Sequence, residues 1–464
     1  MNLESIKKIH FIGIGGIGMS ALAGIAKELG FEVSGSDSAD IYPPASEALE
    51  KYGIKYQVPY KKENLKEPDL VVIGGAISKD NPEVLAAQKE KIEIVSFPEF
   101  LYKISKDKYR IVVTGTHGKT TVSAMIAWIL KEAGENPSFF IGGVLKNLGI
   151  NSSVGKGKYL VAEGDEYFTS VFDRTPKFLH YHPHFGVITS MEMDHFDVYK
   201  NFEGLKAAFQ KFVVQIPANG YFSFNAEDKN LETLSVKGKK ISFGLKKGDY
   251  QAKNITFQGI GSTFEVEFGG GLIGEFQLQV PGVLNIQNAL AAISVAYTIG
   301  IDMEKIRGAL FSFKGVSRRF EIKGKKKGII VVDDYAHHPT AIEATIDAAR
   351  AQFPKKRIWA IFEPHTFTRT RETLSKLAMV FNKADIAVIP DIYGARETGT
   401  EAEKLINSQE VVAAIKKNQP NTFYLPTKEK VLEYVLGEAR KNDIIIVMAV
   451  GSFNKLADEI LEKL

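Results

Sequence analysis

The chain of 464 residues has no cysteine, which excludes a disulfide framework and any thiolate metal site. A metal ion would therefore need oxygen or imidazole ligands. An excess of one charge is also missing, because the formal net charge is only +4, and this argues against a nucleic-acid partner. The basic run KGKKKG at 323–328 lies between strand-like segments, so we interpret it as a solvated hairpin.

Long apolar runs are absent as well. No stretch of about 18 uncharged apolar residues occurs, and the N-terminal MNLESIKKIHFIGIGG has no apolar signal core. We therefore predict a cytoplasmic protein without a membrane partner. The 44% hydrophobic and 25% charged residues are typical of a globular protein, and the length suggests about three domains of roughly 150 residues.

The first motif is a glycine-rich turn between an expected strand and an expected helix. The apolar run IHFI at 9–12 leads into GIGGIGMS, in which the G-x-G-x-x-G glycines are Gly13, Gly15 and Gly18. A second strand ends at Asp37, about twenty residues on, as in a dinucleotide-binding unit. Alone, the motif fits a diphosphate site and a structural turn equally well. With the strand and turn at 69–82, it predicts a small parallel α/β domain over residues 1–105.

The second motif, TGTHGKTT at 114–121, lies between the strand-like YRIVV and a helical pattern that begins at Val122. Backbone N–H groups and the helix dipole favour an anion at such a junction. Lys119 adds a charge for the distal phosphates, and Thr120 offers a hydroxyl to Mg²⁺. A standard phosphate loop would have glycine in place of Val113, but the motif still predicts a mononucleotide site.

Acidic residues follow two further strand-like segments, KYLVAEGDEY and FGVITSMEMDHFD. Ligands of open α/β sheets collect beyond the carboxyl ends of the strands, so these residues suit a metal site, although each alone is equally well explained as a solvated carboxylate. The positions are Glu163, Asp165, Glu166, Asp194 and His195. The segment 251–282 alternates around glycines, which predicts antiparallel strands appended to a central domain over 106–312.

From residue 313 strands and helices alternate again, and four apolar strands each end in a turn with Asp, His or Arg. We predict a third α/β domain over 313–464 whose strand ends face a site. Arg318 and Arg319 at its start could clamp phosphate or form interdomain ion pairs. The fold class is thus α/β with three domains: a Rossmann-like N-terminal domain, a phosphate-loop ATP-binding central domain and a Rossmann-like C-terminal domain.

These motifs, in their order and spacing, resemble those of the Mur ligases, which build the peptide stem of bacterial peptidoglycan precursors. The resemblance covers essentially the whole chain and rests on GIGGIGMS, TGTHGKTT, AEGDE, EMDHFD, PGVLNIQNALAA, GVSRRFE, DDYAHHPT and PHTFTRTR. It implies the branch that uses UDP-N-acetylmuramate, with ATP and Mg²⁺. ATP would phosphorylate the lactyl carboxylate, and an amine would attack the acyl phosphate to give amide, ADP and phosphate.

The resemblance also implies roles for single residues. Catalysis would involve Lys119, His195 and Arg319, and the Mg²⁺ ligands would be Thr120, Glu163 and, less expected for a hard cation, His195. The ATP-binding set would be Gly115, Thr116, Gly118, Lys119, Thr120, Thr121, Asn285, Asn288, Arg319 and Asp334, with the asparagines at adenine. The UDP-sugar set would be Gly13, Gly15, Gly16, Gly18 and Asp37. The incoming amine's carboxylate would be received by Arg369, near His337 and His338.

Some positions depart from the family pattern. Leu284 replaces a histidine that usually precedes the adenine asparagines, and VGSFNK at 450–455 replaces a glycine–aspartate signature. Lys211 lies in roughly the stretch where some members carry a carbamylated lysine, without a firm register. We interpret the histidines of LHYHPH at 179–184 as structural, because they lie on an inserted surface segment with no evident partner acid.

Two acceptor amines compete within the family. DIYPPASEALEKYG, FDRTPKFLHYHP and the GSF ending resemble ligases that attach the tripeptide L-alanyl-γ-D-glutamyl-meso-diaminopimelate, whereas PHTFTRTRETL and PDIYGARETG resemble those that add L-alanine. Since the third domain would receive the amine, we predict L-alanine. The expected partners are UDP-N-acetylmuramate and an amino acid or short peptide, and the expected state is a monomer or weak homodimer.

Other classes of protein explain less of the chain. A nicotinamide-dependent oxidoreductase would leave TGTHGKTT unused, and a regulatory phosphate-loop ATPase would leave GIGGIGMS, DDYAHHPT and PHTFTRTR unused. An inactive relative would have lost Lys119, Glu163 or His195, and all of these are present.

Overall fold

The computed structural model describes residues 5–42, 45–196 and 198–464. The chain divides into two compact units. One comprises Met1–Glu192, Val198–Tyr250 and Ala291–Ala309, and the other comprises Met193–Asp197, Gln251–Leu290 and Leu310–Leu464. Among the described residues, no helix is long and apolar enough to cross a membrane.

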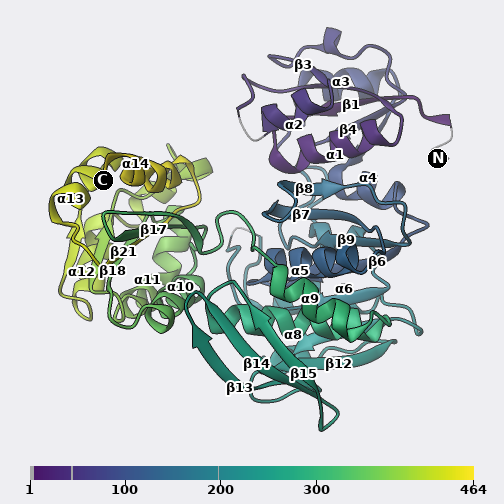
Figure 1. Cartoon of the computed structure of the whole chain (residues 1–464). Helices are drawn as coiled ribbons and strands as arrows, with labels where there is room; N and C mark the ends of the chain where they lie inside the picture. The colour runs from purple at the N-terminus through teal and green to yellow at the C-terminus, as the bar shows by residue number, and fades with distance from the viewer. Residues whose placement is uncertain (1–4, 43–44, 197) are drawn as a thin grey trace. The chain divides into compact units, whose positions relative to one another are not determined.

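The first unit begins with a parallel sheet in the order β3-β2-β1-β4-β5. Figure 1 labels β1, β3 and β4 of this sheet. Its strands are β1 (Lys8–Ile12), β2 (Glu32–Ser36), β3 (Lys55–Gln57), β4 (Leu70–Ile73) and β5 (Glu93–Ser96). The helices between them are α1 (Ile17–Glu28), α2 (Ala45–Lys51), α3 (Pro82–Lys89) and α4 (Phe97–Lys103). Because the chain order reverses between β1 and β4, the turn after β1 lies at a topological switch point, where ligands of such sheets bind.

A second sheet of the first unit runs in the order β12-β11-β10-β6-β9-β7-β8. Its strands are β6 (Tyr109–Thr114), β7 (Ser138–Leu145), β8 (Ile150–Ser153), β9 (Tyr159–Glu163), β10 (Phe185–Ile188), β11 (Tyr221–Asn225) and β12 (Lys239–Gly244). The accompanying helices are α5 (Lys119–Glu132), α6 (Phe202–Val213) and α7 (Lys229–Glu232). Val113 of β6 pairs in parallel with Val187 of β10 and with Glu163 of β9. The three segments after these strands therefore emerge at one edge of the sheet.

Strands and helices along 250–312 lead into the C-terminal sheet. They are β13 (Tyr250–Gln258), β14 (Gly261–Phe268), β15 (Gly271–Leu278), α8 (Val283–Thr298) and α9 (Met303–Ser312). The strands β14 and β15 pair in antiparallel fashion, which confirms the pairing predicted for this stretch.

The second unit contains a sheet in the order β16-β17-β21-β18-β19-β20. Its strands are β16 (Glu321–Lys326), β17 (Ile329–Asp334), β18 (Arg357–Phe362), β19 (Ile386–Ile389), β20 (Thr422–Tyr424) and β21 (Asp443–Met448). The helices are α10 (Pro339–Gln352), α11 (Phe367–Val380), α12 (Ser408–Lys416), α13 (Lys428–Glu438) and α14 (Leu456–Lys463). The four predicted apolar strands are adjacent and parallel, and KGKKKG forms the predicted hairpin of β16 and β17.

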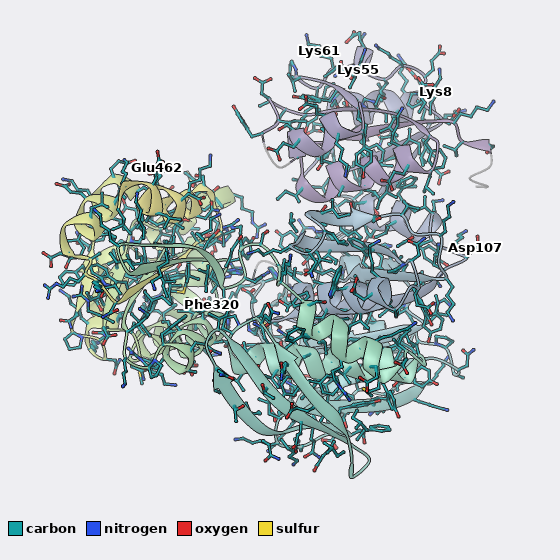
Figure 2. All side chains as sticks on the ribbon, in the orientation of Figure 1. Lys8, Lys55, Lys61, Asp107, Phe320 and Glu462 are labelled. Carbon is teal, nitrogen blue, oxygen red and sulfur yellow. The ribbon has the colours of Figure 1, made fainter. Side chains whose placement is uncertain are left out.

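Short 3₁₀ helices complete the described elements: Lys62–Asn64, Lys177–His180, Ala395–Glu397, Glu401–Lys404 and Ser452–Lys455. Burial follows the predicted pattern, since every residue of β17 and β21 is buried. Charged side chains such as Lys8, Lys55 and Glu462 lie at the surface (Figure 2). The α/β fold class predicted from the motifs is confirmed.

Candidate active site

The loop TGTHGKTT joins β6 to α5, and two glycines determine its shape. Gly115 and Gly118 have φ angles of 123° and 82°, a region that glycine adopts without strain. A side-chain carbon on Gly115 would lie 2.3 Å from Thr189 Oγ1. The loop therefore approaches the end of β10 closely and then turns into the N-terminus of α5, where Thr120 and Thr121 form the first helical turn. Such a terminus favours bound phosphate.

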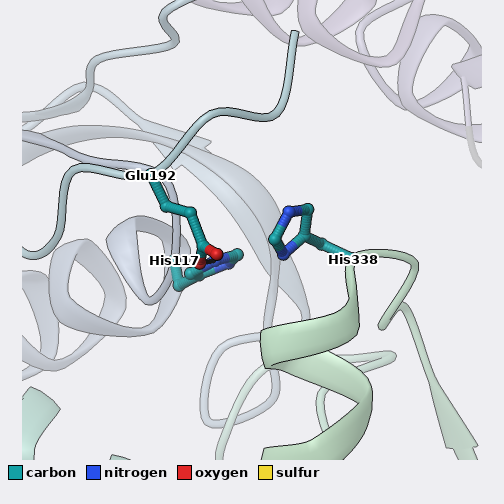
Figure 3. Close-up of side chains that lie close together, drawn as sticks. All are labelled: His117, Glu192 and His338. Carbon is teal, nitrogen blue, oxygen red and sulfur yellow. Dashed lines mark hydrogen bonds and ion pairs between the residues drawn. The ribbon is translucent and has the colours of Figure 1, made fainter. Parts of the chain in front are cut away.

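The segment after β10 holds this loop from one side. The N–H of Thr116 donates to Ser190 O (3.1 Å), and the N–H of His117 donates to Ser190 Oγ (3.0 Å). Thr116 Oγ1 donates to Glu192 O and accepts from its N–H, both at 2.9 Å. His117 Nε2 lies 3.0 Å from a Glu192 carboxylate oxygen, and the two side chains meet in Figure 3. The sequence did not predict these contacts between the loop and the segment after β10. The one sequence feature that points to them is that both motifs follow strands.

Lys119 lies among carboxylates at the start of α5. Its Nζ is 3.0 Å from Glu166 Oε2, and the Glu166 side chain is only 2% exposed. Burial disfavours the ammonium charge, but Glu166, Asp165 and Glu163 outweigh it and raise the pKa of Lys119 above its ordinary value. Lys119 is thus a fixed cation at neutral pH, which a phosphate oxygen can bind in exchange for Glu166.

Thr120 and Glu163 are brought together as their predicted metal roles require. Thr120 Oγ1 donates to Glu163 Oε1 at 2.8 Å, and the N–H of Gly142 donates to Glu163 Oε2 at 2.6 Å. A side-chain carbon on Gly142 would lie 2.8 Å from that oxygen, so glycine permits the close approach. A hydroxyl and a carboxylate are hard oxygen donors, so this pair fits Mg²⁺.

Arg369 of the second unit forms an ion pair with the carboxylate of Asp194. Its Nε donates to Asp194 Oδ1 at 2.6 Å, and its Nη1 lies 2.7 Å from His365 Nδ1. His337 Nε2 is 3.7 Å from Asp194 Oδ2. Burial opposes ionisation of Asp194, but His337, Arg369 and His195 hold the pKa of its carboxyl well below the usual range. Burial, Arg369 and His337 lower the pKa of His365 to about 3, so its neutral ring accepts from Arg369.

The structure thus brings Arg369 and His337 together as predicted, and adds Asp194 and His365 to them. Asp194, a candidate metal ligand in the sequence, is here engaged by the guanidinium. His338 is the buried residue that precedes α10, and burial lowers the pKa of the neighbouring His337.

Asp334, at the end of β17, accepts hydrogen bonds from the main chain on either side of it. Its two oxygens accept the N–H groups of Phe320 and Ala336, both at 2.6 Å. Burial raises the pKa of Asp334, and the charge of Arg319 opposes the rise. Asp334 therefore positions the backbone beside Arg319 in this conformation.

The paired arginines of GVSRRFE take different positions. Arg318 donates to Ala449 O (2.7 Å) and to Val450 O (3.2 Å), so it binds the end of β21 within its own unit. The guanidinium groups of Arg318 and Arg319 lie 4.9 and 5.0 Å from the ring centroid of Tyr335. The aromatic ring holds both cations at the start of the C-terminal sheet.

The predicted adenine asparagines lie on the first turns of α8. Asn285 Nδ2 donates to Pro281 O at 2.8 Å, and Asn288 Nδ2 donates to Asn285 Oδ1 at 3.2 Å. Leu284 beside them is 38% exposed. The two amides thus form one polar strip along the helix.

The glycine turn after β1 is braced by Asp37. Asp37 Oδ2 accepts the N–H of Gly15 at 2.7 Å, and a side-chain carbon on Gly15 would lie at the same distance from that oxygen. Gly13 has a φ of 81°, Gly16 precedes α1, and Gly18 lies in its first turn. The four glycines predicted for the UDP-sugar therefore lie in the turn after β1 and the start of α1, and Asp37 contacts this turn at the switch point of the sheet.

The histidines of LHYHPH make the packing contacts expected of a structural segment. His184 Nδ1 accepts the N–H of Arg110 at 3.1 Å, and burial together with Arg110 lowers the pKa of both His182 and His184. His180 Nε2 is 3.0 Å from Asp173 Oδ2, so this segment does have a partner acid, contrary to our expectation. Lys211 lies exposed on α6.

Families of Mur ligase domains match almost the whole chain. The Mur ligase family catalytic domain matches residues 8–109, the Mur ligase middle domain matches 113–296, and the Mur ligase glutamate ligase domain matches 318–451. A UDP-N-acetylmuramate--L-alanine ligase of Caldanaerobacter subterraneus is 39% identical and covers 100% of this chain and 99% of its own. A ligase of the same name from Acetivibrio thermocellus is 41% identical, covering 99% of this chain and 96% of its own.

Solved structures of the same family resemble the fold. UDP-N-acetylmuramate-alanine ligase of Thermotoga maritima superposes with a TM-score of 0.82 at 29% identity, over 98% of both chains. A murein peptide ligase of Psychrobacter arcticus superposes with a TM-score of 0.72 at 30% identity, also over 98% of both chains. With full-length relatives near 40% identity, the chain belongs to the Mur ligase family.

Proposed function

We propose that this protein ligates L-alanine to the lactyl carboxylate of UDP-N-acetylmuramate with ATP, in peptidoglycan precursor synthesis. The observation that carries the proposal is the site at the start of α5, where Lys119 faces Glu166 and Thr120 meets Glu163. This site suits a triphosphate and Mg²⁺. The choice of L-alanine is supported by relatives near 40% identity that carry the name UDP-N-acetylmuramate--L-alanine ligase.

Each predicted domain would have one task in this reaction. Residues 1–105 would bind the UDP-sugar through the glycine turn and Asp37, and residues 106–312 would bind ATP. Residues 313–464 would bind the amine through Arg369. Asn285 and Asn288 would contact adenine, and Arg319, Asp334, His337 and His338 would lie around the reactants.

The reaction joins two anions before it forms an amide, so its site needs cations. An oxygen of the lactyl carboxylate attacks the terminal phosphorus of ATP, and ADP leaves. The amine nitrogen then attacks the carbonyl carbon of the acyl phosphate, phosphate leaves, and the nitrogen loses a proton as the amide forms. Lys119 would hold the terminal phosphates through both steps, and Arg319 would add positive charge.

The metal residues of the proposal are Thr120 and Glu163 for one Mg²⁺ and His195 for a second. Bound Mg²⁺ would supply Lewis acidity and neutralise phosphate charge. Arg369 would orient the amine by binding its carboxylate in place of Asp194, which it contacts at 2.6 Å in the structure. This exchange replaces one charge-assisted bond by another.

The test is phosphate release from ATP with UDP-N-acetylmuramate present, with L-alanine or the tripeptide as acceptor and the product mass read in parallel. We expect a product with L-alanine. A product with the tripeptide alone would instead support the recycling reaction, which the inserted FDRTPKFLHYHP segment favours and which is consistent with the similarity to a murein peptide ligase. The absence of both products would contradict the proposal.

A further inference from the structure

A buried carboxylate lies behind the glycine turn, and no step of the proposed reaction uses it. Glu83 belongs to the first turn of α3, is 0% exposed, and accepts hydrogen bonds from four donors. These are His10 Nε2 (3.2 Å), the N–H of Lys61 (3.1 Å), Asn64 Nδ2 (2.6 Å) and the hydroxyl of Ser36. Burial alone would raise the pKa of Glu83, but the bonds from His10, Ser36 and Asn64 hold it below its usual value.

The first connection from Glu83 to the turn passes through Ser36. Glu83 Oε2 accepts the Ser36 hydroxyl at the end of β2. The carbonyl of Ser36 accepts the N–H of Gly13 at 2.9 Å and the N–H of Ile14 at 3.0 Å. The bond from the Ser36 hydroxyl to Glu83 therefore fixes Ser36, and the carbonyl of Ser36 fixes the beginning of the glycine turn.

The second connection passes through the segment after β3. The other oxygen, Glu83 Oε1, accepts the N–H of Lys61, and Tyr60 just before it donates to Asp37 Oδ1 at 3.4 Å. Asp37 Oδ2 in turn accepts the N–H of Gly15 at 2.7 Å. The two oxygens of the Glu83 carboxylate are thus connected to the turn by two routes, one to the N–H of Gly13 through Ser36 and one to the N–H of Gly15 through Asp37.

Apolar side chains in place of Glu83 and its side-chain partners together would avoid the cost of burying a charge, and such joint replacements are often neutral or stabilising in proteins. They would not hold position 36 and the segment at Lys61 in fixed directions. The carboxylate therefore provides directional bonds at the place where a bound diphosphate needs the N–H groups of the turn in fixed positions.

We propose that Glu83 is a positioning residue for the UDP-sugar: through Ser36 and the Tyr60–Asp37 contact it sets the geometry of the Gly13–Gly15 backbone that receives the diphosphate. The inference rests on the proposed function, because it takes the turn as the UDP-sugar site. In this role Glu83 would act through these residues and not by contact with the ligand.

The test compares Glu83→Ala and Ser36→Ala with the matched control Asp69→Ala. Asp69 accepts the N–H groups of Lys7 (2.7 Å) and Lys8 (2.8 Å), so it pins the opposite end of the same strand β1. Calorimetric binding of UDP-N-acetylmuramate and the steady-state constants for all substrates are measured on each full-length protein. Ser36→Ala removes a single hydroxyl and keeps the test decisive if Glu83→Ala fails to fold.

We expect Glu83→Ala and Ser36→Ala to raise the Kd and the KM for UDP-N-acetylmuramate about tenfold, which is the loss of about one charge-assisted hydrogen bond. The KM for ATP and kcat should change less than about twofold. Asp69→Ala should leave all three constants unchanged. Unchanged UDP-sugar binding in Ser36→Ala, or an equal shift in Asp69→Ala, would overturn the inference. Wild-type protein that binds the UDP-sugar more tightly than the variants but forms no product would support it and contradict the proposed function alone.

Discussion

Lys119 has a structural role and a proposed ligand-binding role, and two variants separate them. Its Nζ lies 3.0 Å from Glu166, whose side chain is 2% exposed, so Lys119→Met would leave a buried carboxylate without its cation. At an effective dielectric constant of about 20, a pair at that distance attracts by roughly 5 kcal/mol, and breaking a buried pair costs about 3–5 kcal/mol of stability. We expect Lys119→Met to lower the free energy of unfolding by about 3 kcal/mol.

The double variant Lys119→Met/Glu166→Gln removes both charges and should recover most of this loss. It should not recover activity, because the Lys119 ammonium that would hold the terminal phosphates is absent from both variants, and we expect at least about a thousandfold loss of kcat in each. Urea denaturation measures the stability, phosphate release measures the activity, and calorimetry with UDP-N-acetylmuramate checks that the other site is intact. Activity that returned with stability in the double variant would refute the ligand-binding role of Lys119.

Further predictions concern the metal site, the amine site and a buried acid. Thr120→Val removes the hydroxyl 2.8 Å from Glu163, so the Mg²⁺ concentration for half-maximal activity should rise about tenfold in a Mg²⁺ titration; an unchanged midpoint would exclude this ligand. Arg369→Lys cannot keep both the Asp194 and His365 contacts, so we expect the KM for L-alanine to rise about tenfold with the KM for ATP unchanged. Burial, opposed by Arg318, raises the pKa of Glu363 from 4.5 to about 7, so the stability of the wild type falls as pH rises through this range. The free energy of unfolding of Glu363→Gln, measured relative to the wild type by urea denaturation, should therefore rise by about 2 kcal/mol as the pH increases from about 5 to about 8. A difference between the two proteins that stays the same at every pH would contradict the assignment.

The local parts of the site could be predicted from the sequence because they depend on residues close together in the chain. TGTHGKTT follows an apolar strand and precedes a helical pattern, and AEGDE follows a second strand, so the ends of β6 and β9 were expected to carry Lys119, Thr120 and Glu163. Parallel pairing of β6 with β9 then places Thr120 and Glu163 within hydrogen-bond distance. Here strand order converts separate motifs into one site.

The distant pairs could not be predicted, because spacing alone does not specify them. Arg369 and Asp194 are 175 positions apart, and His117 and Glu192 are 75 apart. Each pair requires knowledge of which loops meet. The hydrogen bond from the Gly15 N–H to Asp37 could not be predicted either. A turn motif indicates which backbone conformation is allowed, but it does not indicate which side chain stabilises that conformation. The His180 contact with Asp173 is local, and it was within reach of the sequence.

In the proposed reaction, the lactyl carboxylate of UDP-N-acetylmuramate is phosphorylated before L-alanine attacks it. The most direct measurement uses UDP-N-acetylmuramate labelled with ¹⁸O in the lactyl carboxylate, together with ATP and L-alanine, and reads the mass of the released phosphate. Phosphorylation of the carboxylate transfers one of its oxygens to phosphate, so we predict phosphate that carries a single ¹⁸O in step with formation of the alanyl product. Product formed with unlabelled phosphate would contradict the acyl phosphate and, with it, the roles proposed for Lys119 and Arg319.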